Sequence, residues 1–191
     1  MLKPDIIVVG VGRTGTSTVA RILQTKLGVR MAHNWAGASE FQPEGSYEEQ
    51  KMFPYSYALV EKPHYQVSEW LGGYQKAYAK TTEELLGIKQ TPLSLCTRAQ
   101  WEELDPKLVI RTHRPKDQAV ASMLRCRTPK DKSHWEKFYQ QREKAMQRHL
   151  DYGHTFPVIR IYFDNTARST DEDLIICLEP WVQKVRKGKY A

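Results

Sequence analysis

An apolar run that leads directly into a glycine-rich loop limits the folds open to this chain. Ile6–Val9 is an uninterrupted β-branched stretch, typical of a strand buried on both faces of a parallel sheet. Residues 10–17 then read G-V-G-R-T-G-T-S, and apolar side chains recur at helical spacing until Gly28. The sequence therefore predicts a strand, a glycine loop and a helix in succession.

Strands and helices alternate along the rest of the chain. Further strands are predicted at residues 85–89, 108–111 and 158–163, and residues 31–56 are predicted to form a long loop. Helices are predicted at residues 69–86, after Pro115, at 132–151 and at 171–186, where Pro180 marks a point of breakage. This alternation indicates an α/β fold, namely a three-layer α/β/α arrangement around a central, mainly parallel sheet.

The chain has 191 residues, a length that suits one hydrophobic core, so residues 1–191 are expected to form a single domain. Its three cysteines form no disulfide framework or zinc-ligand spacing. No apolar run approaches the roughly 20 residues of a membrane helix, and the N-terminal run is too short for a signal peptide. We expect a cytoplasmic protein without a membrane span.

The net charge of +7 is unevenly distributed. Residues 107–148 carry a net charge of +8, and residues 184–189 add four positive charges. Such basic segments favour an anionic partner, which can be a nucleic acid, a phosphorylated cofactor or a membrane surface. A solvated basic face explains the same composition equally well.

The glycine loop has the composition of a phosphate-binding site. Glycines let backbone N–H groups converge on an anion, and the helix N-terminus adds about half a positive charge. The spacing of Gly10 and Gly15 matches the start of the nucleotide-binding pattern G-x-x-x-x-G-K-[ST]. Thr16, however, occupies the place of the lysine, and the nearest basic residue is Arg13.

The displaced basic residue resembles a feature of the sulfotransferase family. Residues 12–17 are similar to the loop that binds the 5′-phosphosulfate in that family. Arg114 and Ser122, eight residues apart after a predicted strand, resemble its 3′-phosphate segment. Residues 42–49 and 87–92 are similar to two further family segments, and the match as a whole covers most of residues 6–125.

The resemblance implies a P-loop NTPase-like sulfotransferase fold and a specific cofactor. The cofactor would be 3′-phosphoadenosine 5′-phosphosulfate (PAPS), with adenosine 3′,5′-bisphosphate (PAP) as its product and no metal required. A basic tail in several sulfotransferases closes over the 3′-phosphate, although a frayed C-terminus explains the tail of this chain equally well. The implied cofactor-binding residues are Gly12, Arg13, Thr14, Gly15, Thr16, Ser17, Thr18, Arg114 and Ser122, with Arg186 and Lys187 in the tail.

The implied reaction is in-line transfer of a sulfuryl group to an acceptor hydroxyl or amine of unknown class. Arg13 would stabilise charge on the bridging oxygen of the leaving group, without acting as a proton donor. His33 is the first candidate for the general base, because imidazole accepts protons near neutral pH, and Glu48 is the second. Both residues are also common as ordinary surface groups.

Two alternatives remain open from the sequence. In the first, the chain is a P-loop nucleotide kinase or NTPase, and Val158–Asp164 forms a strand that ends in a magnesium-binding aspartate. In the second, it is a basic nucleic-acid-binding module without catalysis, although the main interpretation expects no nucleic acid partner. The kinase alternative requires ATP binding with Mg²⁺, and this requirement distinguishes it from the other two.

Overall fold

The computed structural model of this protein describes residues 2–32, 50–62, 64–78, 85–126, 130–151, 153–164 and 170–188. A five-stranded sheet forms its centre, with the strand order β2-β3-β1-β4-β5 and every neighbouring pair parallel. The strands are β1 (Ile6–Gly10), β2 (Arg30–Ala32), β3 (Leu86–Lys89), β4 (Leu108–His113) and β5 (Val158–Tyr162). The predicted α/β class with a parallel central sheet is confirmed.

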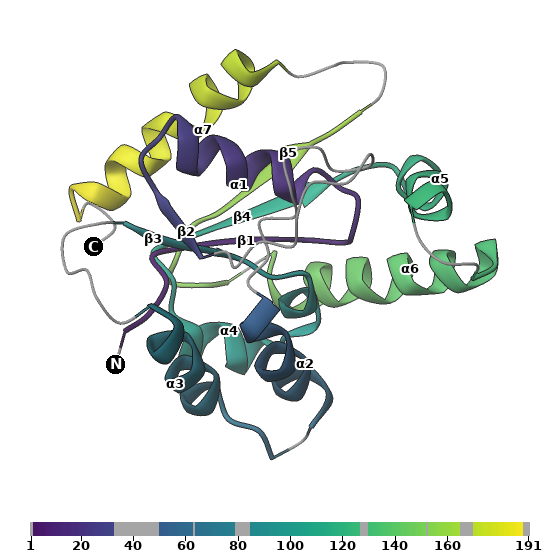
Figure 1. The fold of residues 1–191 in the computed structure, drawn as a ribbon, viewed down its shortest axis with the longest axis horizontal. Helices are drawn as coiled ribbons and strands as arrows, with labels where there is room; N and C mark the ends of the chain where they lie inside the picture. The colour runs from purple at the N-terminus through teal and green to yellow at the C-terminus, as the bar shows by residue number, and fades with distance from the viewer. Residues whose placement is uncertain are drawn as a thin grey trace.

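Helices cover both faces of this sheet (Figure 1). Helices α1 (Thr16–Thr25) and α7 (Asp171–Arg186) lie together on one face. The other face carries α2 (Phe53–Glu61), α3 (Val67–Tyr78), α4 (Arg98–Leu104) and α6 (Lys132–His149), while α5 (Lys116–Cys126) packs on α6 beyond the end of β4. Two short 3₁₀ helices, η1 (Gln50–Met52) and η2 (Thr91–Leu95), complete the described elements.

Strand β1 separates two hydrophobic cores. Ile6 and Val8 face the core shared with α1 and α7, whereas Ile7 and Val9 face the core beneath α2–α4 and α6. All five residues of β1 are buried, as the apolar run predicts for a strand covered on both faces.

The strand register places the glycine loop between two neighbouring strand ends. Gly10 pairs with Thr112 of β4, and Val8 pairs with Lys89 of β3. Parallel strands all end at the same edge of a sheet, so side chains that follow β3 and β4 lie close to the loop that follows β1.

Several sequence predictions differ from the structure at element boundaries. Helix α7 runs without interruption through Pro180, because acidic residues and a Thr170–Asp173 capping box stabilise its first turns. The predicted loop at residues 31–56 contains most of β2 and the start of α2, whose patterns are too short to detect. The helix predicted at residues 69–86 corresponds to α3 (Val67–Tyr78), residues 79–84 lie outside the described residues, and Leu86 belongs to β3. Among the described residues, no helix is long and apolar enough to span a membrane.

Candidate functional site

The loop after β1 is held against β4 by threonine side chains. The Thr14 hydroxyl donates to the Val11 carbonyl oxygen at 2.6 Å and lies 2.8 Å from the Thr112 hydroxyl. A Cβ atom at Gly10 would lie 2.3 Å from the Thr112 Oγ1 atom, so only glycine permits this approach. The two threonines therefore bind the loop to the end of the neighbouring strand.

Gly15 forms the junction between the loop and α1. Its φ angle is 93°, in the left-handed region that favours glycine, and a Cβ atom there would lie 2.4 Å from the Phe163 ring. Gly15 is the N-cap residue of α1 and brings no capping side chain of its own. A helix leaves its first N–H groups without partners within the helix, and an anion is a favourable ligand for them.

A lysine from β3 supplies a cation at this helix start. The Lys89 ammonium donates a hydrogen bond to the Ser17 hydroxyl at 3.0 Å, and Lys89 is 3% exposed. The two residues are 72 positions apart in the chain. Thr16 stands where the nucleotide-binding pattern has its lysine. The fold places a different lysine, Lys89, beside the same turn.

Arg13, Arg114 and Ser122, which the sequence analysis predicts to share a binding site, do lie together in the structure. The Arg13 Nε donates to the Ser122 hydroxyl at 3.1 Å, and the Arg114 Nη1 donates to the Arg13 carbonyl oxygen at 3.3 Å. Burial lowers the pKa of Arg114, and the nearby charges of Arg13 and Arg125 lower it further. This accumulation of positive charge favours a bound anion.

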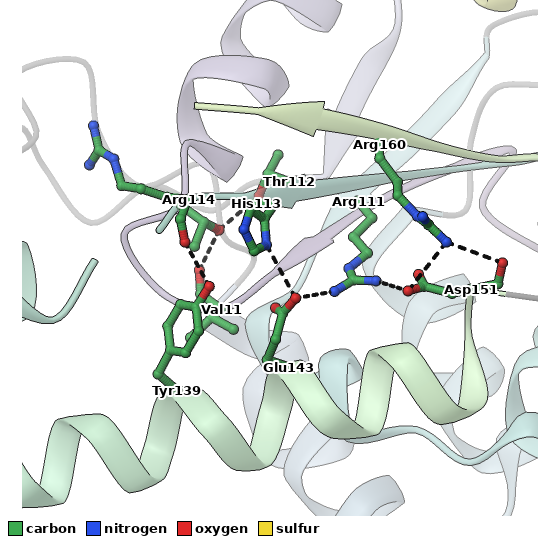
Figure 2. Close-up of polar contacts among 10 residues, drawn as sticks. Val11, Arg111, Thr112, His113, Arg114, Tyr139, Glu143, Asp151 and Arg160 are labelled. Carbon is green, nitrogen blue, oxygen red and sulfur yellow. Dashed lines mark hydrogen bonds and ion pairs between the residues drawn. The ribbon is translucent and has the colours of Figure 1, made fainter. Parts of the chain in front are cut away.

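A buried polar layer links β4 to α6 behind these arginines (Figure 2). Arg111 is 3% exposed and forms ion pairs with Glu143 of α6 and with Asp151. The Asp151 carboxylate also forms an ion pair with Arg160 of β5, at 3.3 Å. None of this network was predicted from the sequence, because its members look like ordinary charges on a strand and a helix.

Two further contacts connect the end of β4 to α6. The Tyr139 hydroxyl donates to the Arg114 carbonyl oxygen at 2.6 Å, and burial raises the pKa of this tyrosine. His113 Nδ1 lies 3.2 Å from the Glu143 Oε1 atom, and 29% of the His113 side chain is exposed. Contacts with α6 therefore hold the end of β4, which touches the glycine loop, in place (Figure 2).

Other predicted site residues lie elsewhere. Arg186 donates to the Leu27 and Gly28 carbonyl oxygens at 2.5 and 3.3 Å, so it lies at the end of α1 that is opposite to the loop. That end is a ten-residue helix away from the loop, or about 15 Å. Lys187 directly follows Arg186. His33 and Glu48, the two candidate bases, lie outside the described residues.

Ser17 and Asp164, the two candidate magnesium ligands of the nucleotide-binding pattern, each contact another side chain in the structure. The Ser17 hydroxyl, which binds the metal in the nucleotide-binding pattern, accepts a hydrogen bond from Lys89 instead. Asp164 follows the edge strand β5, which β4 separates from β1, and it accepts from Gln118 at 3.0 Å. In the described ranges, no three His, Cys, Asp or Glu side chains form a group that could hold a metal ion.

Solved structures similar to this chain include a sugar kinase and a deoxyadenosine kinase. No protein-family model and no curated protein matches the sequence. A sugar kinase from Janibacter sp. matches with a TM-score of 0.53 and 15% identity, over 97% of this chain and 98% of that chain. Deoxyadenosine kinase from M. mycoides with bound dATP matches with a TM-score of 0.52 and 14% identity, over 94% and 99% of the two chains. At such identities the likeness shows the fold.

These matches overturn the sulfotransferase interpretation. The similar structures are kinases, so the family assignment, sulfuryl transfer and PAPS as the cofactor are wrong. The physical reason lies in the motif itself. A glycine loop at a helix N-terminus is built to bind tetrahedral anionic groups, and its few residues do not encode which group is transferred.

Proposed function

We propose that this chain is a P-loop phosphotransferase that binds a nucleoside triphosphate and transfers its terminal phosphoryl group to an acceptor hydroxyl. The observation that carries the proposal is the contact between Lys89 and Ser17. Lys89 supplies a cation at the loop, although this chain has Thr16 at the lysine position of the nucleotide-binding pattern. The Lys89 charge and the N-terminus of α1 both favour an anion at this point.

The likeness to a sugar kinase and a deoxyadenosine kinase supports the same reaction class. Phosphoryl transfer needs the donor, the acceptor and stabilising positive charge held in line, and little covalent chemistry from the protein. In this proposal Gly12–Thr18 hold the donor phosphates through the backbone, and Lys89 binds them from the β3 side. Arg13 and Arg114 then stabilise the charge of the transferring group.

The backbone of Arg13 also supports a functional role. Its φ angle of 68° is in the left-handed region, where a residue other than glycine costs about 1–2 kcal/mol. A side chain kept at such a cost serves a purpose other than backbone preference. The contact between Arg13 and Ser122 directs the guanidinium from the loop toward α5.

The test is nucleotide binding followed by phosphoryl transfer. Thermal unfolding is measured with ATP, ADP and PAP, each with and without Mg²⁺. We expect ATP to stabilise the protein, by about 2.7 kcal/mol at 100 times its dissociation constant. Transfer is then measured with ATP labelled in the terminal phosphate and with deoxyadenosine, glucose and water as acceptors.

The comparison of ligands separates the alternatives. Stabilisation by ATP but not by PAP supports a site for a triphosphate. Stabilisation by PAP alone, or no stabilisation by any of the three nucleotides, contradicts the proposal. Affinity for DNA or RNA with a steep salt dependence, in a chain that does not bind ATP, would favour a basic binding module instead.

A further inference from the structure

His113 lies at the end of β4, directly beside the glycine loop. The preceding residue, Thr112, pairs with Gly10 and contacts Thr14, and the following residue, Arg114, donates to the Arg13 carbonyl oxygen. Neighbouring strands are about 4.8 Å apart, so the His113 backbone lies about one strand spacing from the start of the loop. Its side chain faces α6, on the opposite side of the sheet from α1 (Figure 2).

Glu143 determines which nitrogen of the His113 ring carries the proton. Glu143 Oε1 lies 3.2 Å from His113 Nδ1. The same carboxylate forms an ion pair with Arg111. Because a carboxylate can only accept hydrogen bonds, Nδ1 must donate, and Nε2 of the neutral ring keeps its lone pair.

The Nε2 atom of His113 is chemically available. No hydrogen bond to Nε2 exists among the described residues, and the side chain is 29% exposed. The ring packs against Tyr162 in a tilted arrangement, with ring centroids 5.2 Å apart and an interplanar angle of 60°. The Glu143 carboxylate and the Tyr162 ring thus hold the imidazole in place, and the basic Nε2 atom remains available to a substrate.

The geometry points to His113 as the catalytic base for the acceptor hydroxyl, with Glu143 and Arg111 as positioning residues. This inference rests on the proposed phosphotransferase function. The acceptor oxygen forms a bond to the terminal phosphorus of the nucleoside triphosphate, and the bond to the bridging oxygen breaks, leaving its electron pair on the nucleoside diphosphate. The acceptor proton moves to His113 Nε2, and the resulting imidazolium is stabilised by Glu143.

The activity test uses His113→Asn, whose amide can still donate to Glu143 but offers no basic nitrogen. His134→Asn, on the exposed part of α6, is the matched control. With ATP as donor and deoxyadenosine, glucose or water as acceptor, we expect His113→Asn to slow transfer by about 10²–10⁴-fold. ATP affinity should change less than twofold, and added imidazole should partly restore transfer in His113→Ala.

A second measurement needs no acceptor. Nitrogen NMR of the ¹⁵N-labelled full chain reports the tautomer of each histidine, and the His113→Asn spectrum identifies the signal of His113. We expect the Nδ1–H tautomer in the native protein and its loss in Glu143→Leu, which offers Nδ1 no acceptor, an effect that a purely structural role for Glu143 would not predict.

The outcomes separate the two proposals. If the native protein does not bind ATP, the phosphotransferase proposal itself fails. If ATP binds and His113→Asn transfers phosphate at the full rate, the assignment of His113 is wrong and the phosphotransferase proposal stands. An Nε2–H tautomer in the native protein also overturns the assignment, whether or not any of the three acceptors reacts.

Discussion

The Lys89 ammonium lies 3.0 Å from the Ser17 hydroxyl, at the first turn of the helix that follows the glycine loop. Strand β3 is hydrogen-bonded to β1, and Lys89 is its last residue. A position next to the loop is therefore available to a side chain from β3 as well as to one from the loop itself. The fold provides a lysine beside the first turn of α1, although the glycine-loop motif itself lacks one.

Replacing Lys89 by Met should weaken nucleotide binding and leave the fold intact, because Met keeps most of the aliphatic stem. A charge-assisted hydrogen bond contributes about 1.5–3 kcal/mol, which corresponds to a roughly 10- to 150-fold rise in the dissociation constant for ATP. Isothermal titration calorimetry measures this change. Lys107→Met, which removes an exposed pair with Asp5 before β4, is the control and should bind ATP normally. Equal affinities in the two variants would show that Lys89 does not contact the nucleotide.

Arg13→Gly should slow phosphoryl transfer without destabilising the protein. Glycine adopts the φ angle of 68° without strain, so the free energy of unfolding should stay constant or rise by up to about 1 kcal/mol. Loss of the guanidinium should slow phosphoryl transfer by about 10²–10³-fold. Asp105→Gly, with a φ of 46° outside the site, should show the same backbone effect, less the small contribution of its exposed ion pair with Lys3. An Arg13→Gly protein with native turnover would remove this residue from the mechanism.

Gly15→Ala should destabilise the protein and disturb the conformation of the glycine loop. The new Cβ atom would lie 2.4 Å from the Phe163 ring, at a φ angle of 93°. Strain and overpacking together should lower the free energy of unfolding by about 2–4 kcal/mol, measured by urea denaturation. Gly72→Ala, in α3 with nothing within 4 Å of its Cβ, should instead stabilise the protein by about 0.5–1 kcal/mol. A second change, Phe163→Ala, should recover the steric part of the Gly15→Ala loss.

Arg111→Met should cost far more stability than the loss of a surface cation. The change removes the buried ion pair between Arg111 and Glu143 and also the ion pair between Arg111 and Asp151. Breaking a buried ion pair costs about 3–5 kcal/mol. Lys132→Met, which removes a side chain that is 73% exposed on α6, should change the free energy of unfolding by less than about 0.5 kcal/mol. Similar values from urea denaturation would mean that the buried layer contributes little.

The pair between Arg21 and Asp171 should stabilise the contact of α1 with α7 in a pH-dependent manner. A side-chain hydrogen bond from Arg21 lowers the pKa of Asp171. A carboxyl whose pKa is lowered by folding contributes stability above its ordinary pKa and loses it as the pH falls. Asp171→Asn should therefore lose about 0.5–1 kcal/mol at pH 7 and nearly nothing at pH 2. A difference that persists at pH 2 would point to packing as the cause.

The main parts of the fold can be predicted from local patterns. Ile6–Val9 are buried because a continuous β-branched run suits only a strand that is covered on both faces. The glycine loop is predictable for a similar reason, since Gly10 and Gly15 are required by contacts and backbone angles of the turn itself. The prediction of α/β architecture followed from these elements.

The prediction that Arg13, Arg114 and Ser122 share a site came from the resemblance to sulfotransferases, and the structure brings the three residues together although that family assignment is wrong. The resemblance of the basic tail to that of several sulfotransferases also put Arg186 in this site, where the structure does not place it. The structure places it on the carbonyl groups after α1, since α7 packs along α1 and ends at that helix's C-terminus. The order of strands and the direction of helices, which charge does not reveal, decide this position.

The chemistry of the site depends on contacts between distant segments. Lys89 reaches Ser17 across 72 residues, and Glu143 meets His113 across 30. The sequence by itself determined that a buried strand leads into a glycine loop and a helix, because backbone sterics and burial act over a few residues. Only the tertiary structure decided that Lys89 lies beside that loop and His113 beside that strand end, because parallel strands from separate parts of the chain bring their ends to one edge of the sheet.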